Sequence, residues 1–503
     1  MGGRLCSGHS ESPLLPHCEE QNVLACSAAL GYGDRDILTA IAVRLQSWLE
    51  RVYEALVVIG RAAEIALRLV PLAILTPSAM IAKDLLDYDT PANIAWWYAL
   101  HTLQQLGPAF VKLAQWVATR RDMFPQHICD RFSKLHDDGQ PHTWTYTDGV
   151  LREAFGDNYG LQLEVQSHDV IGCGSAAQVY RGFWRDDNGN MKPVAIKVLH
   201  PNFRHLVERD LRFMSSVANL IHSLPSETIR MVNLPRVAHN FSEILQRQAD
   251  LRLEGSNLTR FRVNFYGQAE KKIGAVFFPK PLYSDEMILI EDLVQNAKPI
   301  ASFLQDESNE GRRIRRELAG PLLQAFLKMV FLDNFVHCDL HPGNVLVRAT
   351  QEPNNRVKRS IVFLDAGIAV SLCPQDQQNL KDLFRAVILN DGKNAGRLMV
   401  ERAKYERCSQ TPGGIDAFAA GVEAIVSEFH DNRKHGLTLG AVRIGSLLGQ
   451  VLELCRVHGV EIDPAMASIV LSTLVLEGLG RSLEPDLNLI DFAIPFVLGR
   501  AMV

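Results

Sequence analysis

The sequence lacks the features that mark several common classes of protein. Its nine cysteines include no Cys-x-x-Cys pair and their total is odd, which argues against a disulfide scaffold or a structural zinc site and fits a reducing compartment. The 52 lysines and arginines do not outnumber the 57 acidic residues, so the composition gives no support for nucleic-acid binding. No internal repeat indicates a solenoid. With 503 residues, 47% of them hydrophobic, the chain can bury a substantial core.

A long uninterrupted hydrophobic run is also missing. Arg61, Glu64 and Arg68 interrupt the apolar stretch at residues 41–82. A charge at the centre of a membrane helix costs about 2.5–3.5 kcal/mol, against roughly 0.3–0.6 kcal/mol gained per leucine or isoleucine. The uncharged part, residues 69–82, contains two prolines and is too short to span a bilayer. Two interpretations remain: a helix packed on the rest of the protein, or an amphipathic helix on a membrane surface.

The N-terminus carries no recognisable targeting signal. Residues 1–36 are rich in glycine, serine, proline and histidine and include several acidic residues, whereas mitochondrial transit peptides are rich in arginine and poor in acids. Cys6 stands where a myristoylation signal has serine or threonine. We expect this segment to be mobile.

The most informative motif is the segment His337-Cys-Asp-Leu-His-Pro-Gly-Asn344, which is followed by Leu364-Asp-Ala-Gly367. An aspartate, an asparagine five residues later and a second aspartate before a glycine is the arrangement by which kinase-like proteins orient a hydroxyl and hold Mg²⁺ against ATP phosphates. An ordinary Asp/Asn turn would not require the second aspartate. The motif therefore predicts a Mg-ATP site with Asp339 as the catalytic residue and Asn344 and Asp365 as the metal ligands.

A glycine-rich turn and a strand lysine complete this signature. The segments Val170–Val179 and Pro193–Lys197 are typical of strand, glycine turn and strand, with a hairpin at Asp186–Asn190 between them. The turn lets backbone amides approach phosphate, and Lys197 reaches the α- and β-phosphates. Either feature alone is a weak signal, since glycine turns and lysines are common in ordinary hairpins and surfaces. Their order relative to Asp339 predicts nucleotide contacts from Ile171, Gly172, Gly174, Ser175, Ala177, Val179 and Ala195.

Together these features resemble the aarF-domain (UbiB-type) atypical kinase family, whose members support coenzyme Q and mitochondrial or plastid lipid metabolism. The resemblance is carried by four segments: Leu106–Pro125, Val170–Lys197, Gln248–Asn257 and His337–Asn344. Leu106–Pro125 is the most specific of them, because ordinary protein kinases have nothing like it. Within the family, the segment that begins at Gln248 is most similar to one mammalian branch.

The resemblance implies further roles. Glu254 corresponds to the helical partner of Lys197, in an ion pair that fixes the amine where the phosphates need it; the alternative is a helix-surface carboxylate. Helices must then lie between these two residues, and we expect them at Leu206–Ile221 and Asn233–Ala249. The strand and hinge that hold adenine through backbone groups correspond to Met287–Leu293, including Glu291 and Leu293.

Three departures from the family pattern bear on activity. The family's Lys-x-Gly-Gln element is Lys112-Leu-Ala-Gln115 here, its Glu-x-Asp element is Gln248-Ala-Asp250, and the metal aspartate lacks a following phenylalanine. Alanine in place of glycine adds one methyl group and favours helix. Gln248 removes a carboxylate that would face Lys112 or a second metal ion. These changes bear on turnover more than on nucleotide binding.

The expected fold is α+β: a kinase-like, two-lobed architecture with a helical N-terminal extension. We expect four parts: a mobile segment at 1–36, a helical extension with the Lys-x-x-Gln element at 37–150, a mixed small lobe at 151–297 and a mainly helical large lobe at 298–503. A hairpin with its tip at residues 351–359 should join the strands that follow Asn344 and precede Asp365.

Three functional interpretations remain open. The first is an active kinase or ATPase that uses Mg-ATP and acts on a lipid or quinone-pathway molecule, with contact to a membrane surface. It follows from the family, in which the helix bearing Lys-x-Gly-Gln covers the groove for a protein substrate. The second is a small-molecule phosphotransferase, a class that shares the His-x-Asp-x-x-x-x-Asn loop but lacks a segment like Leu106–Pro125. The third is a nucleotide-binding pseudokinase scaffold, suggested by Gln248 and Ala366. A mitochondrial location is implied by the family alone.

Overall fold

The computed structural model describes most of the chain, namely residues 44–45, 48–49, 52–53, 56–71, 90–119, 126–132, 141–224, 234–266, 276–351, 357–403, 405–434, 444–484 and 489–498. The expected mobile segment, residues 1–36, lies outside these ranges. The chain divides into two compact units, Met1–Glu64 and Ile65–Val503. In the first unit the described residues are helical, and Arg61 donates a hydrogen bond to Glu64 at 2.6 Å across one turn.

Where a helical extension is expected, the described residues of the second unit include the helices α3 (Thr90–Leu106), α4 (Pro108–Thr119) and α5 (Gln126–Phe132). Lys112 and Gln115 lie on α4. Phe110 of α4 contacts the ring of Phe213 on the later helix α7 (Phe203–His222), with the ring centroids 6.5 Å apart. Aromatic contacts of this kind bury large apolar areas, so the extension is packed on the body of the unit.

Five antiparallel strands form the first sheet. Their spatial order is β1-β2-β3-β6-β5, and they comprise β1 (Leu163–Cys173), β2 (Ala177–Arg185), β3 (Met191–Leu199), β5 (Pro281–Ser284) and β6 (Ile288–Asp292). The helix α6 (Trp144–Phe155) and the short 3₁₀ turn η1 (Tyr159–Leu161) precede β1. Leu151 of α6 is fully buried with Tyr180 and Ile196 of the sheet, so α6 covers one face. The expected boundary at residue 150 falls inside this helix.

The predicted hairpin between β2 and β3 is confirmed. Oδ1 of Asp186 accepts hydrogen bonds from the backbone N–H groups of Asn188 and Asn190, and Gly189 has a φ of 81°. Residues with a Cβ rarely adopt this left-handed conformation, so glycine suits the turn. The two strands then pair in register, with Val179 opposite Lys197.

Helices separate β3 from β5 along the chain: α7, then α9 (Leu234–Gln248) and α10 (Leu251–Tyr266). The helices predicted at Leu206–Ile221 and Asn233–Ala249 are confirmed by α7 and α9. α10 approaches the first sheet closely, because a Cβ added to Gly255 would stand 2.7 Å from Oγ of Ser284 on β5. This contact places Glu254, the preceding residue, next to the sheet.

A second sheet has the order β4-β10-β9-β7 and comprises β4 (Val276–Phe277), β7 (Ala297–Pro299), β9 (Val345–Gln351) and β10 (Val357–Phe363). β9 and β10 are the two strands of the predicted hairpin, and most of its tip lies outside the described residues. β10 also pairs in parallel with β4, which precedes β5 in the chain. A small sheet of β8 (Val336–His337) and β11 (Ala369–Val370) lies beside them.

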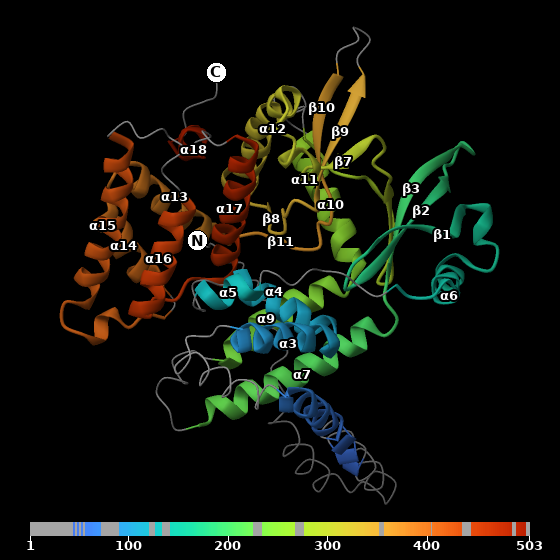
Figure 1. The fold of residues 1–503 in the computed structure, drawn as a ribbon, viewed down its shortest axis with the longest axis horizontal. Helices are drawn as coiled ribbons and strands as arrows, with labels where there is room; N and C mark the ends of the chain where they lie inside the picture. The colour runs from blue at the N-terminus through green and yellow to red at the C-terminus, as the bar shows by residue number, and fades with distance from the viewer. Residues whose placement is uncertain are drawn as a thin grey trace, which may run out of the picture. The chain divides into compact units, whose positions relative to one another are not determined.

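The rest of the unit is helical. Its elements are α11 (Ala301–Leu304), α12 (Asn309–Leu327), the π-helical turn η2 (Lys328–Leu332), α13 (Pro374–Ile388), α14 (Gly392–Arg402), the 3₁₀ turn η3 (Cys408–Gln410), α15 (Gly414–Lys434), α16 (Ile444–His458), α17 (Pro464–Leu483) and α18 (Leu489–Leu498). Figure 1 shows α13 to α16 gathered at the end of this unit away from β1, β2 and β3. The expected α+β, two-lobed fold class is confirmed.

One described helix, α17, is long and apolar enough to cross a membrane by length and composition. More than half of that stretch is buried inside the protein, and core helices share these properties. Its side chains Ile469 and Leu476 belong to the same hydrophobic core as Phe326 of α12.

Candidate functional site

A lysine and two carboxylates from distant parts of the chain meet in the second unit. Nζ of Lys197, on β3, lies 2.8 Å and 3.0 Å from the two carboxylate oxygens of Glu254, on α10. The same Nζ lies 3.2 Å from Oδ2 of Asp365. Glu254 is only 5% exposed, so it is no surface carboxylate. A buried carboxylate needs a charged or hydrogen-bonding partner, and Lys197 supplies it.

Opposite charges dominate the electrostatics of this trio. Burial opposes the charged form of Lys197, but Asp365 and Glu254 outweigh it and raise the pKa of the amine, which stays protonated. Burial would also raise the pKa of Asp365, yet Lys197 and then Lys112 outweigh it and hold that pKa below its usual range. Burial raises the pKa of Glu254, and Lys197 opposes the rise. The site therefore holds Lys197 as an ammonium group beside Asp365 as a carboxylate.

The loop at 337–344 is tied to the segment that carries Asp365. His337 is fully buried; its Nδ1 accepts from the N–H of Asp339 at 3.2 Å, and its Nε2 donates to the carbonyl of Leu364 at 3.0 Å. Burial lowers the pKa of His337, so the ring is neutral and can play both roles. The N–H of Leu364 donates to the carbonyl of Asn344 at 2.9 Å. The geometry of the loop thus depends on the two hydrogen bonds of His337.

The side chains of Asp339 and Asn344 face each other within the same loop. Nδ2 of Asn344 donates to the carbonyl of Asp339 at 3.0 Å and lies 3.4 Å from its Oδ2. Asp365 adopts a left-handed φ of 50°, which is uncommon for a residue with a side chain and is typical of functional sites. One carboxylate and one amide oxygen suit Mg²⁺, which binds few protein ligands and keeps waters and substrate phosphates. No cluster of three or more His, Cys, Asp or Glu side chains suited to another metal occurs among the described residues.

The glycine turn joins β1 to β2 beside β3. The N–H of Gly174 donates to the carbonyl of Ala177 at 2.9 Å, which closes the turn around Ser175. A histidine that the sequence analysis missed supports it: His200 lies 2.8 Å through Nε2 from the carbonyl of Gly174. Nδ1 of His200 lies 2.7 Å from Nδ1 of His142. Burial, followed by the nearby His200, lowers the pKa of His142 to about 4. No motif marks these histidines, since they meet only in the folded chain.

The predicted hinge forms the end of β6. Glu291 pairs with Ala195 of β3 in the sheet register, so both predicted contacts border the same strand pair. The N–H of Leu293 donates to the carbonyl of Pro193 at 3.1 Å. Oε2 of Glu291 is buried and has no hydrogen-bond partner among the described residues. Burial, then Glu254, raises the pKa of Glu291 to about 8.

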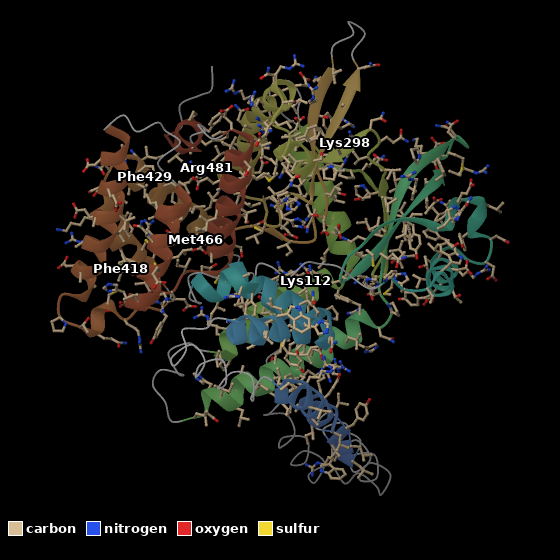
Figure 2. The ribbon with its side chains drawn as sticks, in the orientation of Figure 1. Lys112, Lys298, Phe418, Phe429, Met466 and Arg481 are labelled. Atoms are coloured by element: carbon tan, nitrogen blue, oxygen red, sulfur yellow. The ribbon has the colours of Figure 1, made fainter. Side chains whose placement is uncertain are left out.

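The four residues of the two family elements, Lys-x-x-Gln and Gln-x-Asp, lie in two places. Lys112, labelled on α4 in Figure 2, is close enough to Asp365 to lower its pKa, whereas Asp250 is paired with Arg252 at 2.7 Å. Gln115 lies one turn beyond Lys112 on α4, and Gln248 is the last residue of α9. Lys112 is therefore near the predicted metal ligand Asp365, whereas Asp250 pairs with a different cation.

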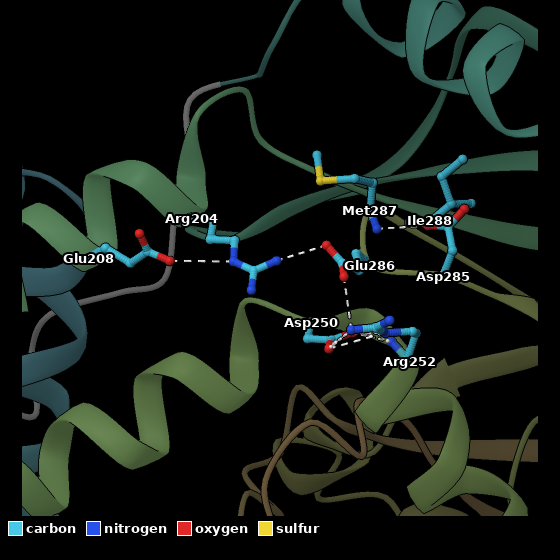
Figure 3. Close-up of polar contacts among 8 residues, drawn as sticks. All are labelled: Arg204, Glu208, Asp250, Arg252, Asp285, Glu286, Met287 and Ile288. Atoms are coloured by element: carbon cyan, nitrogen blue, oxygen red, sulfur yellow. Dashed lines mark hydrogen bonds and ion pairs between the residues drawn. The ribbon is translucent and has the colours of Figure 1, made fainter. Parts of the chain in front are cut away.

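Asp250 belongs to a chain of ion pairs that links three elements (Figure 3). Glu286, in the turn between β5 and β6, lies 2.7 Å from Arg204 of α7 and 2.9 Å from Arg252 of α10. Arg252 in turn holds Asp250. All but Asp250 are about half exposed, so each pair adds little stability, and together they connect α7, the turn between β5 and β6, and the start of α10.

Comparison with known proteins points to one family of kinase-like proteins. The model of the ABC1 atypical kinase-like domain matches residues 134–399, and that of the UbiB helical domain matches residues 432–488. A mitochondrial ABC1 family protein of Schizosaccharomyces pombe is 33% identical over 78% of this chain, which spans 64% of that relative's length. A mitochondrial ABC1 family protein of Saccharomyces cerevisiae is 31% identical over 89% of this chain and 75% of its own length.

Two further similarities are more distant. A "probable serine/threonine-protein kinase" of Dictyostelium discoideum is 28% identical over 88% of this chain and 69% of its own length. The solved complex of Rv3197 with erythromycin from Mycobacterium tuberculosis has a TM-score of 0.41 and 14% identity, covering 68% of this chain and 76% of that one. The match of the kinase-like domain to more than half of the sequence, together with the budding yeast relative, shows that the chain belongs to the ABC1/UbiB atypical kinase-like family.

Proposed function

We propose that the protein binds Mg-ATP at this site and transfers or hydrolyses the γ-phosphate. The observation that carries the proposal is the meeting of Lys197 with both Glu254 and Asp365, residues that come from three separate segments. Asp339 and Asn344 lie on a loop bonded to the segment of Asp365. This is the arrangement that phosphoryl transfer needs, because catalysis there is mainly positioning and charge stabilisation.

Each residue then has a defined task. The ion pair with Glu254 holds the Lys197 amine where it can donate to the α- and β-phosphates, and the turn at Gly172–Ala177 covers them with backbone amides. Asn344 and Asp365 would hold Mg²⁺, which supplies positive charge against the phosphates when bound. Asp339 accepts a hydrogen bond from a hydroxyl or a water and aligns its oxygen with the γ-phosphorus.

A small or lipid acceptor suits this site better than a protein. Lys112 on α4 acts on Asp365, so the extension lies beside the metal position, where it would limit access for a folded substrate. In the second unit, the side chains of Leu67 and Val70 are 75% and 53% exposed. Exposed apolar side chains of this kind are compatible with contact to a membrane surface. The names of the yeast relatives support a mitochondrial location, and the family resemblance supports a role in lipid or coenzyme Q metabolism.

A second candidate function is a nucleotide-binding pseudokinase scaffold. Lys197 is engaged by two carboxylates, and the charge of Lys112 also helps to keep Asp365 ionised, so Asp365 is already balanced by cations of the protein itself. Gln248 also lacks the carboxylate of the family element. Binding without turnover would follow if Asp365 stayed with these lysines instead of turning to Mg²⁺.

Single-turnover assays with labelled ATP separate the two functions. The wild-type chain should release or transfer phosphate, and Asp339→Asn should lose at least about 100-fold of that rate. Asp339→Asn should keep the thermal stabilisation by Mg-ATP, because Asp339 does not hold the nucleotide. Equal rates for the two proteins would remove Asp339 from catalysis, and no turnover in either, with binding retained, would favour the scaffold.

A further inference from the structure

A cavity of about 860 Å³ lies between α10, the start of β3 and the second sheet. Its wall includes Arg262 and Tyr266 of α10, Phe277 of β4 and Arg348 of β9. Asp292, at the end of β6, is the carboxylate on its rim among the described lining residues. The volume lies within the range of roughly 300–1,000 Å³ that is typical of small-molecule sites.

This cavity is distinct from the candidate phosphate and metal site, although Leu293 of the predicted adenine hinge forms part of its wall. None of Lys197, Glu254, Asp339, Asn344 and Asp365 lines it. Arg348 is four residues beyond Asn344 on an extended strand, which corresponds to about 13 Å. A ligand in the cavity would therefore not occupy the place proposed for the triphosphate.

Two arginines are held in the cavity wall by aromatic rings. The guanidinium carbon of Arg348 lies 4.3 Å from the ring centroid of Phe277, and that of Arg262 lies 5.0 Å from the ring of Tyr266. Arg262 donates one hydrogen bond to the carbonyl of Phe278 at 2.7 Å, and Arg348 donates one to Ser360 at 3.4 Å. Each guanidinium has five N–H donors, so most of them remain available.

Neither arginine is neutralised within the part of the chain that the structure describes. They contact the carbonyl, the hydroxyl and the rings, and no carboxylate forms an ion pair with Arg262 or Arg348 there. A third cation of the wall, Lys192, is already paired with Asp186 at 3.1 Å. The two half-buried guanidinium groups, with Asp292 as the one carboxylate among the described lining residues, thus leave a net positive charge beside apolar ring faces.

We propose that this cavity binds a small phosphate monoester with an apolar or aromatic body. Planar guanidinium groups match the oxygens of phosphate, and such a monoester carries about −1.5 to −2 charges at neutral pH, which two arginines balance. The rings of Tyr266 and Phe277 offer apolar contact for the rest of the molecule. Asp292 on the rim disfavours ligands with additional negative groups.

Isothermal titration calorimetry of the full chain with phenyl phosphate tests the proposal. We expect binding to one site in the wild type, and at least about tenfold weaker binding in Arg348→Gln. A tenfold change corresponds to about 1.4 kcal/mol, and the loss of a pair of charge-assisted hydrogen bonds should cost at least that much. Lys298→Gln is the matched control: this exposed lysine of β7 (Figure 2) neighbours β9 without lining the cavity. It should bind as the wild type does.

Four further arms make the outcome decisive. Asp365→Asn should bind phenyl phosphate normally, which separates this cavity from the nucleotide site, and phenol should bind far more weakly. Arg348→Lys should bind with intermediate affinity if Arg348→Gln is misfolded by circular dichroism. Sedimentation with phosphatidylcholine vesicles containing phosphatidic acid shows whether the phosphate can belong to a lipid head group. Absence of binding by the wild type at millimolar ligand, or equal binding by the wild type and a folded Arg348→Gln, would overturn the proposal.

Discussion

At the scale of single residues, the site is organised by one lysine with two carboxylate partners. Nζ of Lys197 contacts Glu254 and Asp365 within 3.2 Å, and removal of either carboxylate would leave buried charge unbalanced. The resemblance to the family implied the pair with Glu254, and the sequence motif implied Asp365 as a metal ligand. The direct contact between Lys197 and Asp365 was not expected, because it depends on how the two lobes close on each other.

Glu291 predicts a pH dependence of stability at the same scale. Its pKa is raised from 4.5 to about 8 by burial, so the folded state keeps a proton that the unfolded chain releases. This contribution is fully present below about pH 4.5 and is lost as the pH rises to about 8. Because the side chain is partly exposed, we expect it to be worth on the order of 2 kcal/mol.

Urea unfolding of the wild type and Glu291→Gln across this pH range measures the effect. The free energy of unfolding of the wild type should fall more steeply with rising pH than that of the variant, because glutamine at position 291 does not titrate. Parallel pH profiles for the two proteins would show that Glu291 is ionised throughout.

At the scale of elements, local patterns were predictable and distant pairings were not. The hairpin Asp186–Asn190 follows from turn residues that act within five positions, and α7 and α9 follow from the long gap between Lys197 and Glu254. The parallel pairing of β4 with β10 joins residues more than 80 positions apart, so no local pattern encodes it. The same holds for His142 and His200 beneath the glycine turn.

The position of α10 depends on a glycine, which gives a prediction at this scale. A Cβ at Gly255 would lie 2.7 Å and 2.8 Å from Oγ and Cβ of Ser284, so Gly255→Ala must push the helix away from the sheet. We expect a net loss of about 1–2 kcal/mol in the free energy of unfolding and a slower turnover, because Glu254 moves with the helix.

Gly149→Ala is the control for this substitution. Gly149 lies on α6, and a Cβ there would meet nothing within 4 Å. Alanine should stabilise that helix by about 0.5–1 kcal/mol and leave turnover unchanged. Equal stability changes for the two variants would mean that α10 is not packed tightly at Gly255.

At the scale of the whole molecule, the two-lobed architecture could be predicted because its motifs are strung along the chain in a fixed order. Lys197, Asp339 and Asp365 mark the lobes, and the segment around Lys112 marks the extension. The cavity lined by Arg262 and Arg348 could not be predicted, since its wall is assembled from six segments and neither arginine belongs to a motif. The partner of Asp250 could not be predicted either. The sequence places two cations in or beside the family elements, Arg252 and Lys112, and only the folded chain shows that Asp250 pairs with Arg252.

The central claim is that Lys197, Glu254, Asp339, Asn344 and Asp365 converge on one magnesium-bound triphosphate. Calorimetric titration of the full chain with ATP, with and without Mg²⁺, tests it most directly beside Lys197→Ala. We predict one nucleotide bound per chain, dependence on Mg²⁺, and affinity weakened at least about tenfold in the variant. No heat of binding in the wild type, or equal affinity for the wild type and a folded Lys197→Ala, would contradict the account.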